Sequence, residues 1–183
     1  MKIIAISAVT AGGKTTVVRA LSERLPNAAA LYFDDYTFAG AVEDYAKWYA
    51  EGADVHVWDL SPLRDDIEAV IRSGRYDWLL LDYPFAYRHE MLREYLDCCI
   101  FLDTPLDIAM VRRVLRDMQN ASAQEIRAEM EAYLQYARPV YLQMQKEQLA
   151  SADHVIDGAQ PLETIIREVT ETVLQQQGET ICN

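Results

Sequence analysis

Five short apolar runs alternate with longer stretches of helical periodicity along this 183-residue chain. The runs are rich in β-branched and other apolar residues, which is typical of buried strands in a parallel sheet. We expect strands over residues 3–7, 28–33, 77–83, 98–103 and 153–156. We expect helices after the first strand, from Ser61, over 88–96, from Thr104, from Ser122 and from about Pro161. The pattern predicts one α/β domain: a three-layer fold with about five parallel strands and helices on both faces. Its ligand cleft should lie at the strand carboxyl ends.

A glycine-rich loop follows the first strand, where residues 8–16 are AVTAGGKTT. Glycine lets backbone N–H groups approach a polyphosphate, and the N-terminus of the next helix adds positive potential. Lys14 can reach the β- and γ-phosphate oxygens, and Thr15 can place its hydroxyl on Mg²⁺. The chain therefore has the fold pattern of a P-loop NTPase. We expect the nucleotide phosphates to be bound by Ala11, Gly12, Gly13, Lys14, Thr15 and Thr16.

Ala8 stands where the motif G-x-x-x-x-G-K-[ST] has its first glycine. A left-handed alanine costs about 1–2 kcal/mol. We therefore expect Ala8 to have an ordinary backbone conformation, with Gly12 and Gly13 forming the tight part of the loop. The alternative is a plain strand-to-helix turn with a capping threonine, which the offset of GGKTT from the strand disfavours.

Carboxylates follow two other predicted strands. Asp34 and Asp35 come after the second strand, and only one of them can easily face the cleft of Lys14, because consecutive strand residues point to opposite faces. A carboxylate there can accept the proton of a hydroxyl that attacks a γ-phosphate, whereas capping a turn is the alternative for either residue. Asp82 ends the third strand, where P-loop proteins hold a carboxylate on Mg²⁺ or its waters. The alternative is a turn aspartate before a proline.

Residues 36–59 combine aromatic and acidic side chains with little regular periodicity. These side chains are Tyr36, Phe38, Tyr45, Trp48, Tyr49 and Trp58, with Glu43, Asp44, Glu51, Asp54 and Asp59. Such a stretch suits a flat, neutral or cationic ring and its hydroxyls, so we assign 36–60 to acceptor binding. The alternative is a surface lid whose aromatic rings pack on the core. Because Ser61 and Pro62 supply the start of the next helix, we expect Asp59 to be free of capping and available to a ligand.

A basic cluster lies on the helix after the fourth strand. Thr104 is expected to cap this helix, and its buried stripe is expected to contain Ile108, Val111, Leu115 and Met118. Arg112, Arg113 and Arg116 project together from another face. Guanidinium groups suit the charge on a transferring phosphoryl group, and complementing the helix C-terminus is the alternative. A short lid over 112–122 and a break at Pro139, beside Arg138, complete the prediction for this part.

Charge and cysteine content narrow the class of partner. A net charge of −12 argues against a broad nucleic-acid or membrane surface, so any anion must be held by a local site. Cys98, Cys99 and Cys182 suggest neither a disulfide framework nor a metal site, and they favour buried thiols of a cytoplasmic protein. No segment approaches the ~18–20 apolar residues that span a bilayer.

These residues resemble the uridine kinase and nicotinamide riboside kinase group of P-loop kinases over most of the chain. SAVTAGGKTT and LPNAAALYFDDYTF are similar to nicotinamide riboside kinases, which implies that Asp34 is the catalytic aspartate. VWDL resembles an aromatic–Asp pair, which implies that Trp58 stacks on the base and Asp59 binds the ribose hydroxyls. RRVLRD and ARPVYLQMQ are more similar to uridine kinases, whose lid arginines contact ATP phosphates.

The sequence thus predicts a kinase that uses ATP and Mg²⁺ and phosphorylates a hydroxyl of a nucleoside-like small molecule, of the uridine or nicotinamide riboside type. The acidic segment mildly favours a cationic ring. The expected catalytic residues are Asp34, Lys14, Arg112 and Arg116, with Arg113 on the nucleotide and Thr15 and Asp82 on the metal. The expected acceptor residues are Asp35, Tyr36, Trp58, Asp59 and Arg138.

Two alternatives stay open. A nucleoside monophosphate kinase would need arginines for the acceptor phosphate, and residues 36–60 contain none. A regulatory nucleotide-binding ATPase would have no small-molecule acceptor, and the absence of an N-K-x-D motif weakens a GTPase switch in particular.

Overall fold

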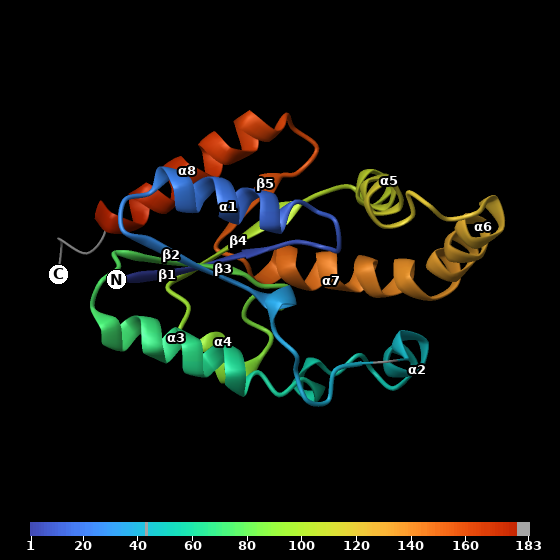
Figure 1. Ribbon diagram of the computed structural model, residues 1–183, viewed down its shortest axis with the longest axis horizontal. Coiled ribbons are helices and arrows are strands. Elements are labelled where there is room, and N and C mark those ends of the chain that lie inside the picture. The colour runs from blue at the N-terminus through green and yellow to red at the C-terminus, as the bar shows by residue number, and fades with distance from the viewer. Residues whose placement is uncertain (43, 179–183) are drawn as a thin grey trace.

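A five-stranded parallel sheet forms the centre of the molecule (Figure 1). The computed structural model describes residues 1–42 and 44–178, so Glu43 and Cys182 lie outside the described residues. The strands are β1 (Lys2–Ser7), β2 (Ala28–Tyr32), β3 (Trp78–Asp82), β4 (Cys98–Asp103) and β5 (His154–Asp157). Their order in the sheet is β2-β3-β1-β4-β5. All of the expected strands are therefore confirmed, with small shifts at their ends.

The strand register gathers the chemically interesting residues at one edge of the sheet. Ile6 of β1 pairs with Asp82 of β3, and Asp82 in turn pairs with Tyr32 of β2. The loop after β1, the turn after β2 and the carboxylate that ends β3 consequently meet at the carboxyl edge.

Helices cover both faces of the sheet, which confirms the predicted three-layer architecture. One face packs against α1 (Lys14–Arg24) and α8 (Leu162–Gly178), through buried residues such as Leu21 and Val169. The other face packs against α3 (Ser61–Ser73) and α4 (Glu90–Arg93), through residues such as Ile67. The helix expected over 88–96 is shorter than predicted, because only α4 within it is helical.

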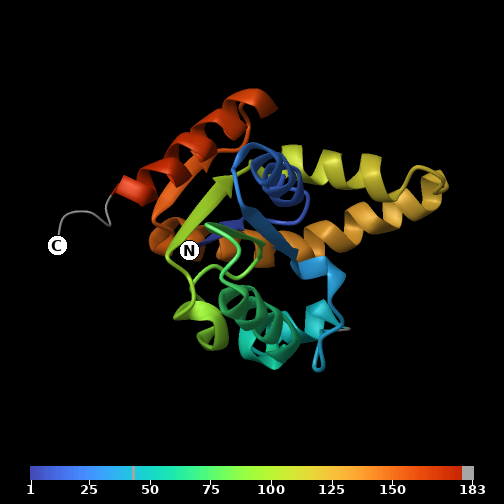
Figure 2. The ribbon, with the colours of Figure 1, turned by 60° about the vertical axis from the view of Figure 1, so that its left-hand side comes forward.

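The remaining helices lie beyond the carboxyl ends of the strands, except that the last of them returns along β4 (Figures 1 and 2). They are α2 (Tyr45–Ala50), α5 (Leu106–Asp117), α6 (Ala123–Ala132), a π-helical segment (Tyr133–Ala137) and α7 (Arg138–Ser151). Short 3₁₀ turns occupy Phe33–Asp35 and Val55–Val57. The capping box predicted for Ser122 and Glu125 opens α6. The break expected at Pro139 takes the form of the π-helical segment, after which α7 begins.

Two expectations for α5 are wrong. Thr104 does not cap the helix, because Pro105 is at the cap position and no side chain caps it. Val111 and Leu115 do not form a buried stripe, since they are 59% and 68% exposed. Figure 2 shows α5 extending away from the sheet, so the apolar residues in its second half have no layer to cover them.

Candidate functional site

The phosphate loop has the backbone that the sequence predicted. Ala8 is not among the described residues with positive φ, whereas Gly13 has φ 105°. A Cβ on Gly12 would lie 2.7 Å from the Cβ of Ala8 and 2.9 Å from the carbonyl oxygen of Val9. Gly12 and Gly13 therefore do carry the tight part of the loop. Ala11 is left-handed, at φ 58°, a conformation that costs about 1–2 kcal/mol and that no pattern in the sequence predicted.

Lys14 lies across the loop that precedes it. Its Nζ donates hydrogen bonds to the carbonyl oxygens of Ala8 at 3.2 Å and Val9 at 3.4 Å. Burial lowers the pKa of this ammonium group, while the carboxylates of Asp82 and Asp34 act in the opposite direction. The Lys14 charge thus faces two carboxylates from the neighbouring strand ends, on the side where α1 begins.

Thr15 and Asp82 form a buried polar pair beside Lys14. The Thr15 hydroxyl donates to Oδ2 of Asp82 at 2.5 Å, and Asp82 is only 3% exposed. Burial raises the pKa of Asp82, against the hydrogen bond from Thr15. A cation placed here would stabilise the buried carboxylate.

The donor set of this pair fits Mg²⁺. A hydroxyl and a carboxylate offer hard oxygen ligands, and Mg²⁺ is usually held by one or two carboxylates together with substrate phosphates and water. Within residues 1–42 and 44–178, no group of three or more His, Cys, Asp or Glu side chains could hold a metal ion. A metal at Thr15 and Asp82 would therefore need further oxygen ligands from water or from a bound nucleotide.

One cavity of about 1060 Å³ joins the phosphate loop to the helices beyond the sheet. Most of the predicted site residues line it: Ala11, Gly12, Gly13, Lys14, Thr15, Thr16, Asp34, Trp58, Asp82, Arg112, Arg113 and Arg116. Asp35, Tyr36, Asp59 and Arg138 are not among its lining residues. Its volume lies just above the usual range for ligand sites of about 300–1,000 Å³, which leaves room for two ligands.

The two adjacent aspartates after β2 differ in position. Asp34 lines the cavity and Asp35 does not. Strand alternation predicted that only one would face the cleft, but the separation arises in the 3₁₀ turn Phe33–Asp35. Tyr36 is turned to the side of α3, where its hydroxyl donates to Oδ2 of Asp66 at 2.8 Å.

The arginine cluster of α5 faces the cavity and is partly neutralised by acidic neighbours. Arg113 forms a 2.7 Å ion pair with Glu129 of α6, and Arg116 binds Asp117 through two hydrogen bonds. Asp117 raises the pKa of Arg116. The sequence analysis missed Glu129, because its position depends on how α6 returns along α5.

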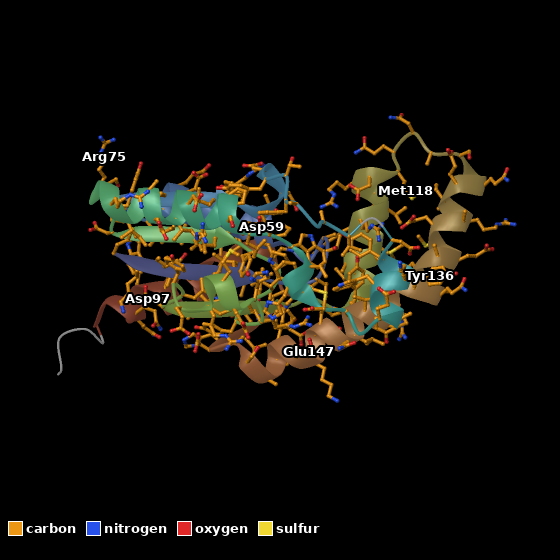
Figure 3. All side chains as sticks on the ribbon, turned by 90° about the horizontal axis from the view of Figure 1, so that it is seen from below. Asp59, Arg75, Asp97, Met118, Tyr136 and Glu147 are labelled. Carbon is orange, nitrogen blue, oxygen red and sulfur yellow. The ribbon has the colours of Figure 1, made fainter. Side chains whose placement is uncertain are left out.

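Aromatic side chains from separate parts of the chain line the cavity and form an aromatic chamber of Trp48, Trp58, Tyr133, Tyr136 and Tyr141. Trp58 is 6% exposed, and its ring lies 5.4 Å from that of Trp48 and 5.1 Å from that of Phe85. Three tyrosines of the π-helical segment and α7 also line the cavity: Tyr133, Tyr136 and Tyr141. Figure 3 shows Tyr136 beside α2, which contacts the π-helical segment. The sequence analysis missed these tyrosines, since their distance along the chain from residues 36–60 hid the contact.

Two expected acceptor residues have other surroundings. Oδ1 of Asp59 accepts hydrogen bonds from the backbone N–H of Ser61 at 3.0 Å and from its hydroxyl at 2.5 Å. The expectation that Asp59 is available to a ligand is not met at Oδ1, because this atom binds Ser61, the first residue of α3. Leu60 is at the cap position of α3, and no side chain caps the helix. Arg138 lines a separate hollow of about 610 Å³, with Asp107 and Leu142.

The phosphate loop between β1 and α1, the strand order and the buried aspartate at the end of β3 define a P-loop nucleotide-binding fold. Two solved structures are similar to this chain, at 16% identity each. TT1252 from Thermus thermophilus has a TM-score of 0.58 and covers 96% of this chain and 97% of its own. A possible uridine kinase from Bacillus stearothermophilus has a TM-score of 0.52 and covers 85% and 88%.

Sequence comparisons show which P-loop proteins this chain is similar to. Residues 79–164 match the phosphoribulokinase / uridine kinase family. The uridine kinase of Streptococcus equi subsp. zooepidemicus is 28% identical over 179 residues, which cover 84% of this chain and 86% of the relative. The uridine kinase of Bacillus pumilus is 31% identical over 115 residues, covering 61% and 54%. The resemblance predicted from the sequence is confirmed: this chain is similar to uridine kinases of the P-loop class.

None of the helices in the described part of the chain is both long and apolar enough to span a membrane. The cytoplasmic location remains a prediction.

Proposed function

We propose that this protein is an ATP-dependent kinase that transfers the γ-phosphoryl group to a hydroxyl of a nucleoside-like acceptor. The observation that supports this most strongly is one cavity that is lined by the phosphate loop, by Asp34 and by the aromatic chamber. The similarity to uridine kinases supports the same reaction class.

In this proposal the nucleotide phosphates bind at the start of α1. Lys14 gives up its hydrogen bonds to the loop carbonyls and binds β- and γ-phosphate oxygens. Arg113 leaves its ion pair with Glu129 and binds a phosphate. Arg112 and Arg116 stabilise the negative charge that spreads over the transferring group. Phosphoryl transfer asks little covalent chemistry of the protein, so positioning and electrostatic stabilisation supply most of the catalysis.

Thr15 and Asp82 are the proposed holders of Mg²⁺, which neutralises charge on the β- and γ-oxygens when it is bound. Asp34 is the proposed base. As the acceptor oxygen forms its bond to the γ-phosphorus, the bond from that phosphorus to the bridging oxygen breaks and ADP leaves. The hydroxyl proton passes to the Asp34 carboxylate.

The acceptor is proposed to occupy the aromatic chamber. The residues from 36–60 that line it are Asp44, Tyr45, Trp48 and Trp58, none of which is basic. This composition favours an acceptor without a phosphate, which weighs against a nucleoside monophosphate kinase. Asp44 adds negative charge beside aromatic faces, which favours a cationic ring such as nicotinamide riboside over uridine.

A phosphorylation screen tests the proposal. Wild-type protein is incubated with ATP, Mg²⁺ and pyrimidine, purine or pyridinium ribosides, and the products are separated by mass. Asp34→Asn should lower turnover on the best acceptor about a hundredfold or more, which is within the usual range for a general base. Asp35→Asn is the matched control, because Asp35 does not line the cavity; it should keep turnover close to wild type.

The outcomes separate the hypotheses. Slow ATP consumption that is the same with and without every acceptor would favour a regulatory ATPase. If Asp34→Asn matches wild type while a phosphorylated riboside is still formed, the base assignment is wrong and the kinase proposal stands.

A further inference from the structure

Thr104 makes a buried contact to the phosphate loop from outside the loop motif. It follows the last residue of β4, is fully buried, and donates a hydrogen bond from Oγ1 to the carbonyl oxygen of Gly12 at 2.8 Å. The two residues are 92 positions apart in the sequence. Thr104 does not line the cavity, although Gly12 does.

This contact fixes one peptide unit of the loop. The described residues contain no cis peptide, so the N–H of Gly13 points away from the Gly12 carbonyl that Thr104 holds. The other side of Gly12 is also held, because its own N–H donates to the carbonyl oxygen of Val9 at 2.9 Å. Gly13 is the cap residue of α1, so its N–H belongs to the free donors at a helix N-terminus that bind anions.

The turn after β5 packs closely against Thr104. A Cβ on Gly158 would lie 2.0 Å from Oγ1 of Thr104, and the N–H of Gly158 donates to the carbonyl oxygen of Asp103 at 3.0 Å. Glycine at 158 therefore leaves the Thr104 hydroxyl in place. This turn leads into α8, where Leu162 and Ile165 line the cavity.

We propose that Thr104 is a positioning residue of the nucleotide site, which holds the Gly12–Gly13 peptide so that the Gly13 N–H faces the nucleotide phosphates. The inference rests on the proposed function, since it requires a nucleotide at the phosphate loop. The opposing interpretation is a purely structural hydroxyl that is satisfied by the nearest carbonyl group.

Thr104→Val and Thr104→Ser test this directly. Valine keeps the shape and removes the donor, whereas serine keeps the donor. The measurements are the Kd for ADP by titration calorimetry, the KM for ATP and for the best acceptor, and the thermal midpoint. We expect Thr104→Val to raise the Kd for ADP and the KM for ATP about five- to thirtyfold, as expected for a lost buried hydrogen bond. The KM for the acceptor should not change, and Thr104→Ser should restore ATP binding to near wild type.

A core variant controls for general destabilisation. Ile67→Val shortens a fully buried side chain on the opposite face of the sheet, and it should lower the thermal midpoint without changing ADP binding. Thr104→Ala provides the same test if Thr104→Val does not fold, and Gly158→Ala should weaken ADP binding by displacing the hydroxyl.

Two negative results have different meanings. Wild-type protein that binds no ADP overturns the proposed function together with this inference. If the wild-type protein binds ADP and Thr104→Val binds it with the same Kd, whatever the thermal midpoint of the variant, only the role of Thr104 is overturned.

Discussion

Replacement of Trp58 by alanine tests whether this ring of the aromatic chamber is also part of the hydrophobic core. The indole is 6% exposed and packs against the rings of Trp48 and Phe85. Truncating a buried Trp to Ala costs about 3–5 kcal/mol. For a domain of this size, 1 kcal/mol corresponds to about 2–4 °C, so we expect the thermal midpoint to fall by about 6–20 °C.

Trp48→Ala is the matched control, because Trp48 is only half-buried and lines the same cavity. It should cost less than half as much stability while it still raises the KM for the acceptor. Trp58→Phe keeps an aromatic ring in the core, and it should recover most of the stability. Urea unfolding followed by circular dichroism gives the free energies. A loss below about 1 kcal/mol in Trp58→Ala, far under the cost of a buried indole, would refute the placement of this ring in the core.

Two further predictions concern titratable groups. Because burial raises the pKa of Asp82, its ionised form destabilises the fold above that pKa. Asp82→Asn should therefore raise the thermal midpoint of nucleotide-free protein, and it should abolish kinase activity. A lowered thermal midpoint in this variant would contradict the stability prediction. Burial, together with the nearby His56, lowers the pKa of His89, while the hydrogen bond to the Trp58 carbonyl and the charges of Asp54 and Glu90 act in the opposite direction. The unfolded chain thus binds this proton more readily, so the free energy of unfolding should fall as pH drops below about 6.5. His89→Asn should flatten that decline between pH 7.5 and 5.5, and an equal decline in both proteins would rule out His89 as the cause.

The sheet and the phosphate loop could be predicted because their signals are local. Each strand is a short apolar run, and GGKTT follows the first one at a fixed offset. The backbone of Ala8 could be inferred from the steric cost of the alternative. Asp82 could be placed in the cleft because parallel strands bring their carboxyl ends to one edge.

The other parts of the site depend on contacts that local patterns do not encode. The apolar spacing of α5 suggested that Leu115 is buried, but this helix extends past the sheet and leaves it exposed. Ser61 looked like the cap of α3, yet it is the first residue of that helix and binds the carboxylate of Asp59. Glu129 and Thr104 contact site residues from helices or strands that are distant in sequence, so no motif assigned them to the site.

The central claim is that the phosphate loop holds a nucleoside triphosphate with its terminal phosphorus directed at Asp34. A crystal structure of the protein with a nonhydrolysable ATP analogue and Mg²⁺ tests it most directly. We predict the γ-phosphate within hydrogen-bonding distance of Nζ of Lys14, with the Asp34 carboxylate facing it across the space for an acceptor hydroxyl. An analogue bound elsewhere, or an Asp34 side chain turned away from the γ-phosphate, would contradict the account.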